Sequence, residues 1–373
     1  MTACPHRPPC PGCPRFGMTG VAPAPLGALT ALCADAGLPA PVVVDGTAGG
    51  HRHRARLAVR GRATSPKIGI FQEASHRIAD IPRCVVHHPL INTVADAVKA
   101  AIRRTGTAPY ADAPHRGALR YLQVVVERRS GTAQVVLVGN GDEPALLDAL
   151  ATEVERLLGP ALHSLWWNGQ PERTNAILGP HWLRWTGPAA VRETIGGADV
   201  FFPPGAFGQS NLPLADSLVT QVHAWVPDGA AVTEFHAGCG ALGLGLLPRV
   251  SRLACNEVAP DSLAGLALGI EAAPAGTRAR ILAGPAADHL DALDGADVVV
   301  VDPPRKGIDA ALLETLVAAP PARLVVVSCG IEAFLREAEA LRRRGGMQLR
   351  ALVPFALFPF TEHVETVALF ERV

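Results

Sequence analysis

The chain lacks any long apolar run, although hydrophobic residues make up 49% of its 373 residues. No stretch approaches the ~18–20 consecutive apolar residues that a membrane-spanning helix needs. The opening residues, MTACPHRPPC, also lack the apolar segment of a secretory signal peptide. We therefore expect a cytoplasmic protein that does not enter the membrane. Its eight cysteines should then be reduced, so a cluster of them indicates a metal or catalytic site rather than disulfides.

Charged residues are scarce as well, at 18%, and the net charge is zero. The charge is unevenly distributed, because residues 1–130 carry 17 Lys and Arg against 7 Asp and Glu, whereas residues 131–373 carry 17 against 27. The basic front half suggests contact with a polyanion. An arginine-rich solvated face would give the same count, and charge alone does not decide between the two.

The length exceeds the ~100–200 residues of a usual domain, so we expect two domains, at 1–195 and 196–373. The first mixes helices and hairpins in an α+β pattern. Its expected helices are 26–36 and 92–104 (with Asn92 or Thr93 as N-cap) and 143–158, and its expected strands are 52–59, 67–71, 121–127, 132–138, 161–168 and 175–178.

The second domain shows strand–helix alternation, which predicts a parallel, doubly wound α/β sheet. After a helix at 211–226, the expected strands are 232–235, 252–256, 280–282, 297–301 and 324–328. Two final strands, 348–354 and 364–370, should form an antiparallel edge.

Four cysteines have the spacing of a ligand set. Cys4, Cys10 and Cys13 form a C-x5-C-x2-C run, and Cys84 lies far downstream in IPRCVVHHP. Three close thiolates and one remote thiolate can complete a tetrahedral or a cubane site. The spacing suits zinc and an iron–sulfur cluster alike, with a slight preference for zinc, and unliganded surface thiols are the plainer alternative.

A glycine-containing turn follows the first strand of the second domain, in VTEFHAGCG. His236, Gly238 and Gly240 lie in this turn, where the backbone can approach a ligand at the carboxyl end of a parallel strand. Glu257 ends the next strand and could accept hydrogen bonds from ribose hydroxyls. Nucleotide, dinucleotide and adenosylmethionine sites share this pattern, and a purely structural turn would show it too.

The segment VVVVDPPRKG at 298–307 is more specific. Its paired prolines stiffen the loop after a buried strand and hold Asp302 at the junction of cofactor and substrate. Amino-group methyltransferases have an aromatic residue after the prolines, where it stacks on a base, but this chain has Arg305. The motif therefore argues against methylation of an exocyclic amine and for different ring chemistry.

Cys329 and Glu365 are the expected catalytic pair. Cys329 follows the buried strand 324–328, and Glu365 opens the last strand. A thiolate can add to an electron-poor carbon, and a buried carboxylate with a raised pKa can act as a general base. Carbon 5 of uracil needs this pair, because thiol addition at carbon 6 makes carbon 5 nucleophilic and a base must then remove its proton. A structural cysteine and an ion-paired carboxylate are the plainer alternatives.

Taken in order, these features resemble the bacterial RNA uracil-5 methyltransferase family, which makes 5-methyluridine in transfer and ribosomal RNA. The resemblance covers nearly the whole chain and rests on the four cysteines, Phe207-Gly-Gln209-Ser-Asn211, Asp302-Pro-Pro-Arg, Ser328-Cys329 and His363-Val-Glu365. It implies a Rossmann-like class I methyltransferase domain that uses S-adenosylmethionine, with Cys329 as nucleophile and Glu365 as base. It also implies that Gln209 and Asp302 line the cofactor and uracil site. The four cysteines would hold a [4Fe–4S] cluster, which changes the expectation from zinc to iron–sulfur.

The chain departs from the family pattern at several positions. Glu234, His236 and Ala237 stand where the family usually has Asp, an aromatic residue and Cys, Ala241 stands where it commonly has Asn, and Gly330-Ile331 replaces Asn-Pro. Many relatives begin with a small RNA-binding β-barrel, whereas this chain begins at the cysteine run, as in the 23S ribosomal RNA branch. We expect a monomer that binds ribosomal or transfer RNA. The alternatives are a related enzyme acting on another pyrimidine and a non-catalytic RNA-binding or assembly factor with a degenerate pocket.

Overall fold

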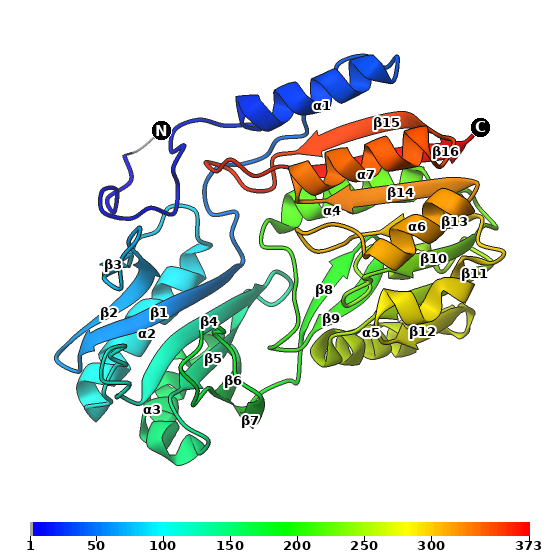
Figure 1. The fold of residues 1–373 in the computed structure, drawn as a ribbon. Helices are drawn as coiled ribbons and strands as arrows, with labels where there is room; N and C mark the ends of the chain where they lie inside the picture. Colours follow the sequence, from blue (N-terminus) through cyan, green and yellow to red (C-terminus); the bar gives the residue numbers. More distant parts are fainter. Residues whose placement is uncertain (1–2) are drawn as a thin grey trace. The chain divides into compact units, whose positions relative to one another are not determined.

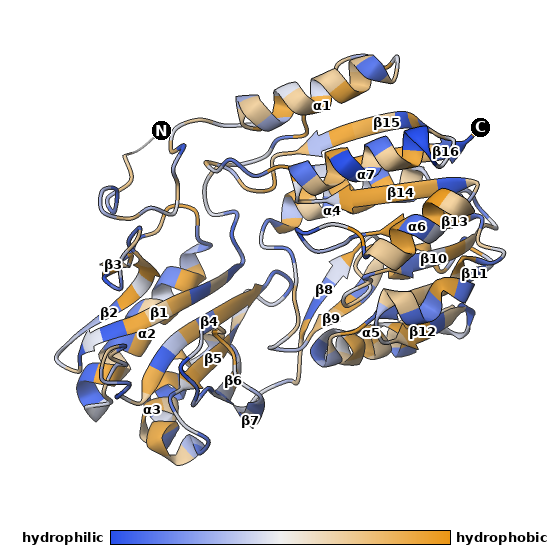
Figure 2. Cartoon of the chain, in the orientation of Figure 1, coloured by the Kyte–Doolittle hydropathy of each residue, from blue (hydrophilic) through white to orange (hydrophobic). Residues whose placement is uncertain are grey.

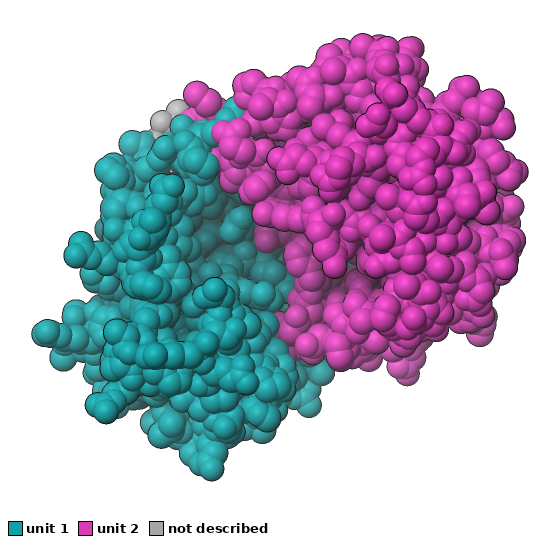
Figure 3. Space-filling view, viewed as in Figure 1, with its two compact units in different colours: residues 1–16, 47–193 teal, residues 17–46, 194–373 magenta. Residues whose placement is uncertain are grey.

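The computed structural model describes residues 3–373 and divides into two compact units. Unit 1 comprises the chain up to Phe16 and Thr47–Glu193, and unit 2 comprises Gly17–Gly46 and Thr194–Val373 (Figure 3). The expected single boundary after residue 195 therefore does not describe the segment 17–46, which packs with the second unit. None of the helices in the described part of the chain is long and apolar enough to cross a membrane.

Unit 1 contains a seven-stranded mixed sheet in the order β3-β2-β1-β4-β5-β6-β7 (Figure 1). Its strands are β1 (Arg54–Arg62), β2 (Ser65–Phe71), β3 (Ile78–Asp80), β4 (Leu119–Glu127), β5 (Thr132–Gly139), β6 (Leu162–Gly169) and β7 (His181–Thr186), and its helices are α2 (Pro89–Thr105) and α3 (Asp148–Leu158). Only β5 and β6 pair in parallel. Alternate strand residues such as Leu57, Val124 and Val135 form one core with α2 and α3. The residues between them, Arg56 among them, belong to the opposite face of the sheet.

Two expectations for unit 1 are wrong in detail. Helix α2 begins earlier than its predicted N-cap at Asn92 or Thr93, because Pro89 occupies its first turn and the His88 ring nitrogen accepts a hydrogen bond from the Leu90 N–H at 3.3 Å. The predicted strand at 175–178 is a loop. Two buried side chains hold this loop through its backbone. Asn168 donates to the Gly179 carbonyl oxygen, and Gln170 donates to that of Leu178.

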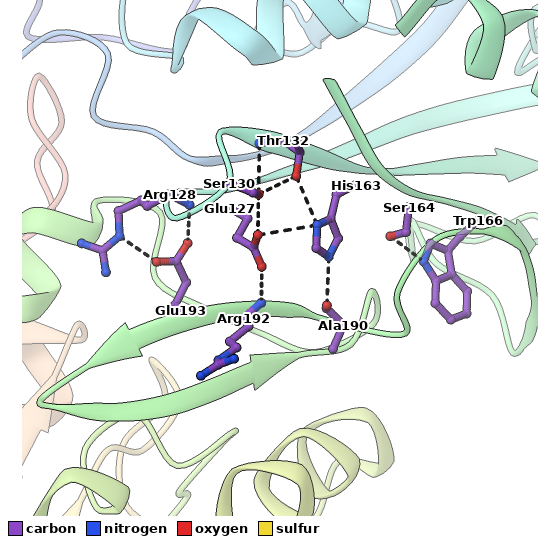
Figure 4. Close-up of polar contacts among 10 residues, drawn as sticks. All are labelled: Glu127, Arg128, Ser130, Thr132, His163, Ser164, Trp166, Ala190, Arg192 and Glu193. Carbon is purple, nitrogen blue, oxygen red and sulfur yellow. Dashed lines mark hydrogen bonds and ion pairs between the residues drawn. The ribbon is translucent and has the colours of Figure 1, made fainter. Parts of the chain in front are cut away.

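Polar contacts fix the chain where it leaves unit 1 (Figure 4). The Arg192 N–H donates to the Glu127 carboxylate at 2.9 Å, and Arg128 donates from its backbone N–H and its side chain to Glu193, at 2.8 and 2.7 Å. These reciprocal pairs join the end of β4 to the start of β8 (Val191–Ile195), which forms a two-stranded sheet with β9 (Ala198–Phe202).

Unit 2 contains a seven-stranded sheet in the order β12-β11-β10-β13-β14-β16-β15 (Figure 1). Its strands are β10 (Ala231–Phe235), β11 (Arg252–Glu257), β12 (Ala279–Ala283), β13 (Val298–Val301), β14 (Arg323–Ser328), β15 (Met347–Phe355) and β16 (Glu365–Arg372). The first five pair in parallel, and β16 and β15 complete the sheet as an antiparallel edge, which confirms that prediction. The sheet order reverses at β10, so a ligand is expected beyond the carboxyl ends of the strands there.

Helices surround this sheet, as the α/β alternation predicts. They are α1 (Pro23–Asp35), α4 (Leu212–Ala224), α5 (Pro260–Ala272), α6 (Ala310–Ala318) and α7 (Ile331–Arg343). Figure 2 shows the central strands β13 and β14 as continuous apolar runs, as expected of strands buried on both faces. Val299, Val326 and neighbours on one face pack against Leu29 of α1, Leu312 of α6 and Phe334 of α7.

Segment 17–46 belongs to unit 2 for reasons that the sequence does not reveal. Leu29 and Cys33 of α1 are fully buried in the unit 2 core. Val44 extends the sheet, because its N–H donates to the Pro354 carbonyl oxygen and its own carbonyl oxygen accepts from the Ala356 N–H, both at 2.9 Å. These contacts join residues more than 300 positions apart, so no local pattern encodes them.

Candidate functional site

The catalytic pair predicted from the sequence meets at one edge of the unit 2 sheet. Ser328 at the end of β14 lies opposite Thr366 near the start of β16 in the antiparallel register. The next residues outward, Cys329 and Glu365, therefore face the same edge, where β13 also ends and Asp302 follows it. Because β16 runs against its neighbours, its first residue reaches the edge where the parallel strands finish.

Cys329 is half-buried and lies two residues before α7 begins at Ile331. Burial raises the pKa of its thiol, and the charges of Glu365 and Asp302 raise it further. Arg305 opposes this shift through its charge and a side-chain hydrogen bond to the thiol. The four side chains are thus within electrostatic reach of one another. The positive end of the following helix also favours a thiolate.

Glu365 and Asp302 form an acidic pair beside the thiol. Glu365 is 1% exposed, and burial together with the charge of Asp302 holds its pKa well above the usual range. Burial likewise raises the pKa of Asp302 to about 7. Glu365 is consequently a stronger base than an exposed carboxylate, as removal of a proton from carbon requires.

The loop from Asp302 to α6 contacts helix α7, which fixes its backbone. The Ile308 N–H donates to the buried Glu337 carboxylate at 2.7 Å, and a side chain at Gly307 would overlap with that carboxylate. A Cβ atom at Gly330 would overlap with the Arg305 carbonyl oxygen. Gly330 therefore suits the close approach of the Arg305 backbone, which gives this departure from the family's usual Asn a steric reason.

The turn after β10 forms the second part of the site. His236, Gly238 and Gly240 have φ values of 61°, 57° and 85°, in the left-handed region that favours glycine. The Glu257 carboxylate accepts hydrogen bonds from the N–H groups of Gly238, at 2.8 Å, and of the two residues that follow Glu257, at 2.7 Å each. These bonds fix the carboxylate beside the turn and leave it acceptor capacity for a ligand's hydroxyl groups.

Two buried polar atoms near this turn have no partner among residues 3–373, namely His236 Nε2 and Glu234 Oε1. Burial lowers the pKa of His236, so its ring is neutral. Burial and the charges of Asp302 and Glu257 raise the pKa of Glu234 to about 8. Buried polar groups are rarely left unpaired, so these two atoms are candidates for contact with a polar ligand bound at this turn.

Gln209 is half-buried in the segment between β9 and α4. Two positions on, the Asn211 side chain donates to the Leu357 carbonyl oxygen at 3.4 Å. Leu357 lies in the segment that leads into Glu365, so the F-x-Q-x-N motif is joined to the approach to the expected base. The contact of Arg305 with the thiol was not predicted from the sequence. The position of Arg305 directly after the two prolines is the feature that could have indicated it.

The four cysteines of the predicted ligand set gather in unit 1. The pKa of Cys13 is raised to about 11 by burial and then by the charges of Cys84, Cys10 and Cys4. Cys84 and Cys10 also pack against the unit 1 core. Within residues 3–373, however, no three or more His, Cys, Asp or Glu side chains are arranged to hold a single metal ion.

Comparisons with known proteins agree with the geometry. Residues 288–373, which include Asp302, Cys329 and Glu365, match the family model described as tRNA (Uracil-5-)-methyltransferase. An uncharacterized RNA methyltransferase of Protochlamydia amoebophila is 37% identical over 89% of this chain and 88% of its own length. Another, from Gloeobacter violaceus, is 33% identical over 89% of this chain and 72% of its own length.

Among solved structures, the Pyrococcus abyssi tRNA (uracil-54, C5)-methyltransferase in complex with S-adenosyl-L-homocysteine is similar in fold. It matches with a TM-score of 0.80 at 24% identity, over 98% of this chain and 86% of that chain. The similarity supports the Rossmann-like class I methyltransferase fold of unit 2. The chain therefore belongs to the RNA uracil-5 methyltransferase family, the S-adenosylmethionine-dependent enzymes that methylate carbon 5 of uracil in RNA.

Proposed function

We propose that Cys329 and Glu365 carry out this methylation on a uridine of ribosomal or transfer RNA, with 23S ribosomal RNA as the first substrate to test. The observation that carries the assignment is the β14–β16 register, which sets a thiol and a buried carboxylate at the same edge of the sheet. Transfer RNA is the second substrate to test, because the matching family model and the Pyrococcus neighbour are both named for transfer RNA. A non-catalytic RNA-binding factor would have no use for this pair.

The reaction follows from the chemistry of the two side chains. The Cys329 thiolate adds to carbon 6 of uracil, and the electrons of the 5,6 double bond move to carbon 5 and the neighbouring carbonyl oxygen. S-Adenosylmethionine, when bound, would supply the methyl group to carbon 5 as its sulfur–methyl bond breaks, and would leave as S-adenosylhomocysteine. Glu365 then takes the proton from carbon 5, the double bond re-forms, and the carbon 6–sulfur bond breaks to release the thiolate.

The residues around the turn after β10 fit the methyl donor. Glu257 has acceptor capacity for ribose hydroxyls, and the unpartnered His236 nitrogen offers a further polar contact. Gly238 and Gly240 keep the backbone accessible to the ligand. Gln209 and Asp302 would complete the pocket on the side of the uracil.

Transfer of labelled methyl groups from S-adenosylmethionine to unmodified ribosomal and transfer RNA, followed by nucleoside analysis, tests the proposal. Label in 5-methyluridine, from one of the two RNAs, would support it and identify the substrate. Protein that binds S-adenosylmethionine but labels neither RNA would contradict it and favour the non-catalytic factor. Label in another pyrimidine nucleoside would show that the protein is a related enzyme with a different target base.

We expect the methylation rate to rise with pH across neutrality. Burial, with the charges of Glu365 and Asp302, raises the pKa of Cys329 above its usual value of 9.0, and Glu365 also has a raised pKa. Both groups act in their deprotonated forms, so kcat/KM should rise between about pH 6 and about pH 9, by roughly tenfold per pH unit where one group is still protonated and more steeply where both are. Single-turnover rates measured across this pH range would check this, with RNA affinity measured at each pH so that changes in binding can be separated from changes in rate. A rate that falls over this range would mean that a protonated group is required.

We further propose that Cys4, Cys10, Cys13 and Cys84 hold a [4Fe–4S] cluster. A single zinc ion needs its sulfurs within ~2.3 Å of one point. In a four-iron cluster each thiolate binds a different iron, so the sulfurs stand further apart. The Cys84 sulfur already accepts hydrogen bonds from two backbone N–H groups, those of Val86 and His87.

Two buried polar groups just before β1, His51 Nδ1 and Arg52 Nε, have no hydrogen-bond partner among the described residues. Arg52 pairs with the segment after Cys84, which contains His87. Burial, with the charge of Arg52, lowers the pKa of both histidines to about 4, so their rings are neutral at pH 7. N–H groups of this kind can donate to cluster sulfides, and the positive charge of Arg52 suits an anionic cluster. The residues present therefore fit the group.

Replacing Cys84 by Ser should abolish cluster binding. We expect anaerobically purified Cys84→Ser protein to lose its iron, its acid-labile sulfide and its visible absorbance. Cys33→Ser, which removes a buried thiol from unit 2, should retain all three. Stoichiometric zinc in place of iron in the unsubstituted protein would overturn the iron–sulfur assignment.

A further inference from the structure

Unit 1 contains a cavity of about 820 Å³ that the reaction does not use. It is lined by the face of β1, β2 and β4 opposite to α2 and α3, and by the loops around residues 110–112 and 173–177. Its volume lies within the ~300–1,000 Å³ of sites that accept compact organic ligands. The loop wrongly predicted as a strand at 175–178 is thus one wall of a cavity.

The cavity has a frame of aromatic rings around two buried arginines, Arg60 and Arg120, of which Arg120 also lines it. Arg60 binds Asp112 through two hydrogen bonds, at 2.7 and 2.9 Å. The same guanidinium carbon lies 4.9 Å from the ring centroid of Tyr110, 5.2 Å from that of Phe71 and 5.3 Å from that of Tyr121. Because Asp112 neutralises Arg60, this part of the frame is a fixed aromatic surface without net charge.

Two further arginines give the cavity a positive charge. Arg56 is exposed, and its only hydrogen bond within residues 3–373 runs from Nε to the Gln123 side chain at 2.6 Å. Arg173 is also exposed and donates from one terminal nitrogen to backbone carbonyl oxygens. The only carboxylate in the lining is that of Asp112, which is already paired with Arg60. Arg56 and Arg173 therefore retain N–H groups for an anion.

We propose that this cavity binds one unstacked nucleotide of a single-stranded RNA segment, with its base against Phe71 and Tyr121 and its phosphate at Arg56 and Arg173. Aromatic surfaces beside arginines are how proteins bind unstacked bases and their phosphates. A free inorganic anion would need the arginines but not the rings, and a duplex keeps its bases stacked and out of reach. The choice of RNA as the ligand rests on the proposed function. The site would be a second RNA contact, separate from the methylated uridine.

Equilibrium binding of full-length protein to fluorescently labelled RNA tests the site without any methyl transfer. The probes are a single-stranded polyuridine oligonucleotide and an RNA duplex of equal length, each titrated at several salt concentrations. Arg56→Ala and Arg173→Ala should each weaken binding of the single strand by about tenfold and reduce the salt slope by about 1, since each removes one phosphate contact. Phe71→Leu, which keeps an apolar side chain but removes the ring, should weaken binding by about fivefold or more without changing the salt slope.

Arg62→Ala provides the matched control, because Arg62 is an exposed arginine on the same strand, β1, outside the cavity lining. It should bind the single strand as the unsubstituted protein does. An equal loss in Arg62→Ala and Arg56→Ala, or no loss in any variant, would overturn the proposal. Equal losses on duplex and single strand would also overturn it, since they would indicate phosphate contact alone. A protein that binds through the cavity but methylates no RNA would refute the proposed reaction while leaving this inference intact.

Discussion

Replacement of Cys329 by Ala is expected to lower methyl transfer by roughly 10⁴-fold or more, as removal of a catalytic nucleophile does in other enzymes. Without the thiolate, carbon 5 of uracil has no route to become nucleophilic, and neither the base nor the methyl donor can substitute for it. Binding of S-adenosylmethionine and RNA should be unchanged, because Cys329 is only half-buried and its loss leaves the β14–β16 pairing intact. Single-turnover transfer of labelled methyl, together with the two binding constants, measures this.

The matched control is Cys33→Ala. Cys33 is a buried cysteine of the same unit, in α1, and its thiol belongs to the hydrophobic core. This variant should unfold somewhat more easily and yet methylate at the normal rate. If Cys329→Ala protein also turns over normally, Cys329 is not the nucleophile, and the thiol at the end of β14 is a structural residue.

The central β-strands of unit 2 could be predicted because β13 and β14 are short apolar runs, each followed by a distinctive residue, Asp302 and Cys329. That pattern gave the sheet, its antiparallel edge, and the shared edge of Asp302, Cys329 and Glu365. The packing of α1 on the same unit could not be predicted, because Leu29 and Cys33 form a helix face whose partner lies some 300 residues away. Helical periodicity identifies an apolar face but not the surface that covers it.

The cavity of unit 1 was missed for a related reason. Arg56, Arg60 and Phe71 lie on two consecutive strands, and in the sequence they resemble the arginine-rich solvated face that the charge count also allowed. The antiparallel pairing of β1 with β2 and β4 brings them to one face of the sheet. The strand assignments were available from the sequence, but the register was not, and register decides which side chains share a face.

Replacement of Glu365 by Gln is expected to slow turnover by roughly 10²–10⁴-fold and to accumulate a covalent complex. Thiol addition and methyl transfer precede the step that needs the base, so RNA should remain joined to Cys329 through carbon 6, with its methyl group already on carbon 5. The adduct should survive denaturing electrophoresis and carry the methyl label. Glu371→Gln changes a carboxylate at the far end of the same strand, where it pairs with Arg323 and Arg350, and should accumulate no adduct.

Stability separates this chemical effect from a structural one. Glu365 has its pKa raised by burial, so between its usual pKa of 4.5 and its folded pKa the folded state binds a proton that the unfolded state has lost. The free energy of unfolding therefore falls as pH rises through this range. Gln does not titrate, so this pH-dependent loss of unfolding free energy is absent from the Glu365→Gln protein. The variant should be at least as stable as the unsubstituted protein near pH 8, and the difference in stability should disappear below about pH 4.5. A stable variant without an adduct would mean that another group removes the proton, whereas a stable variant with the adduct would place Glu365 at the carbon 5 proton.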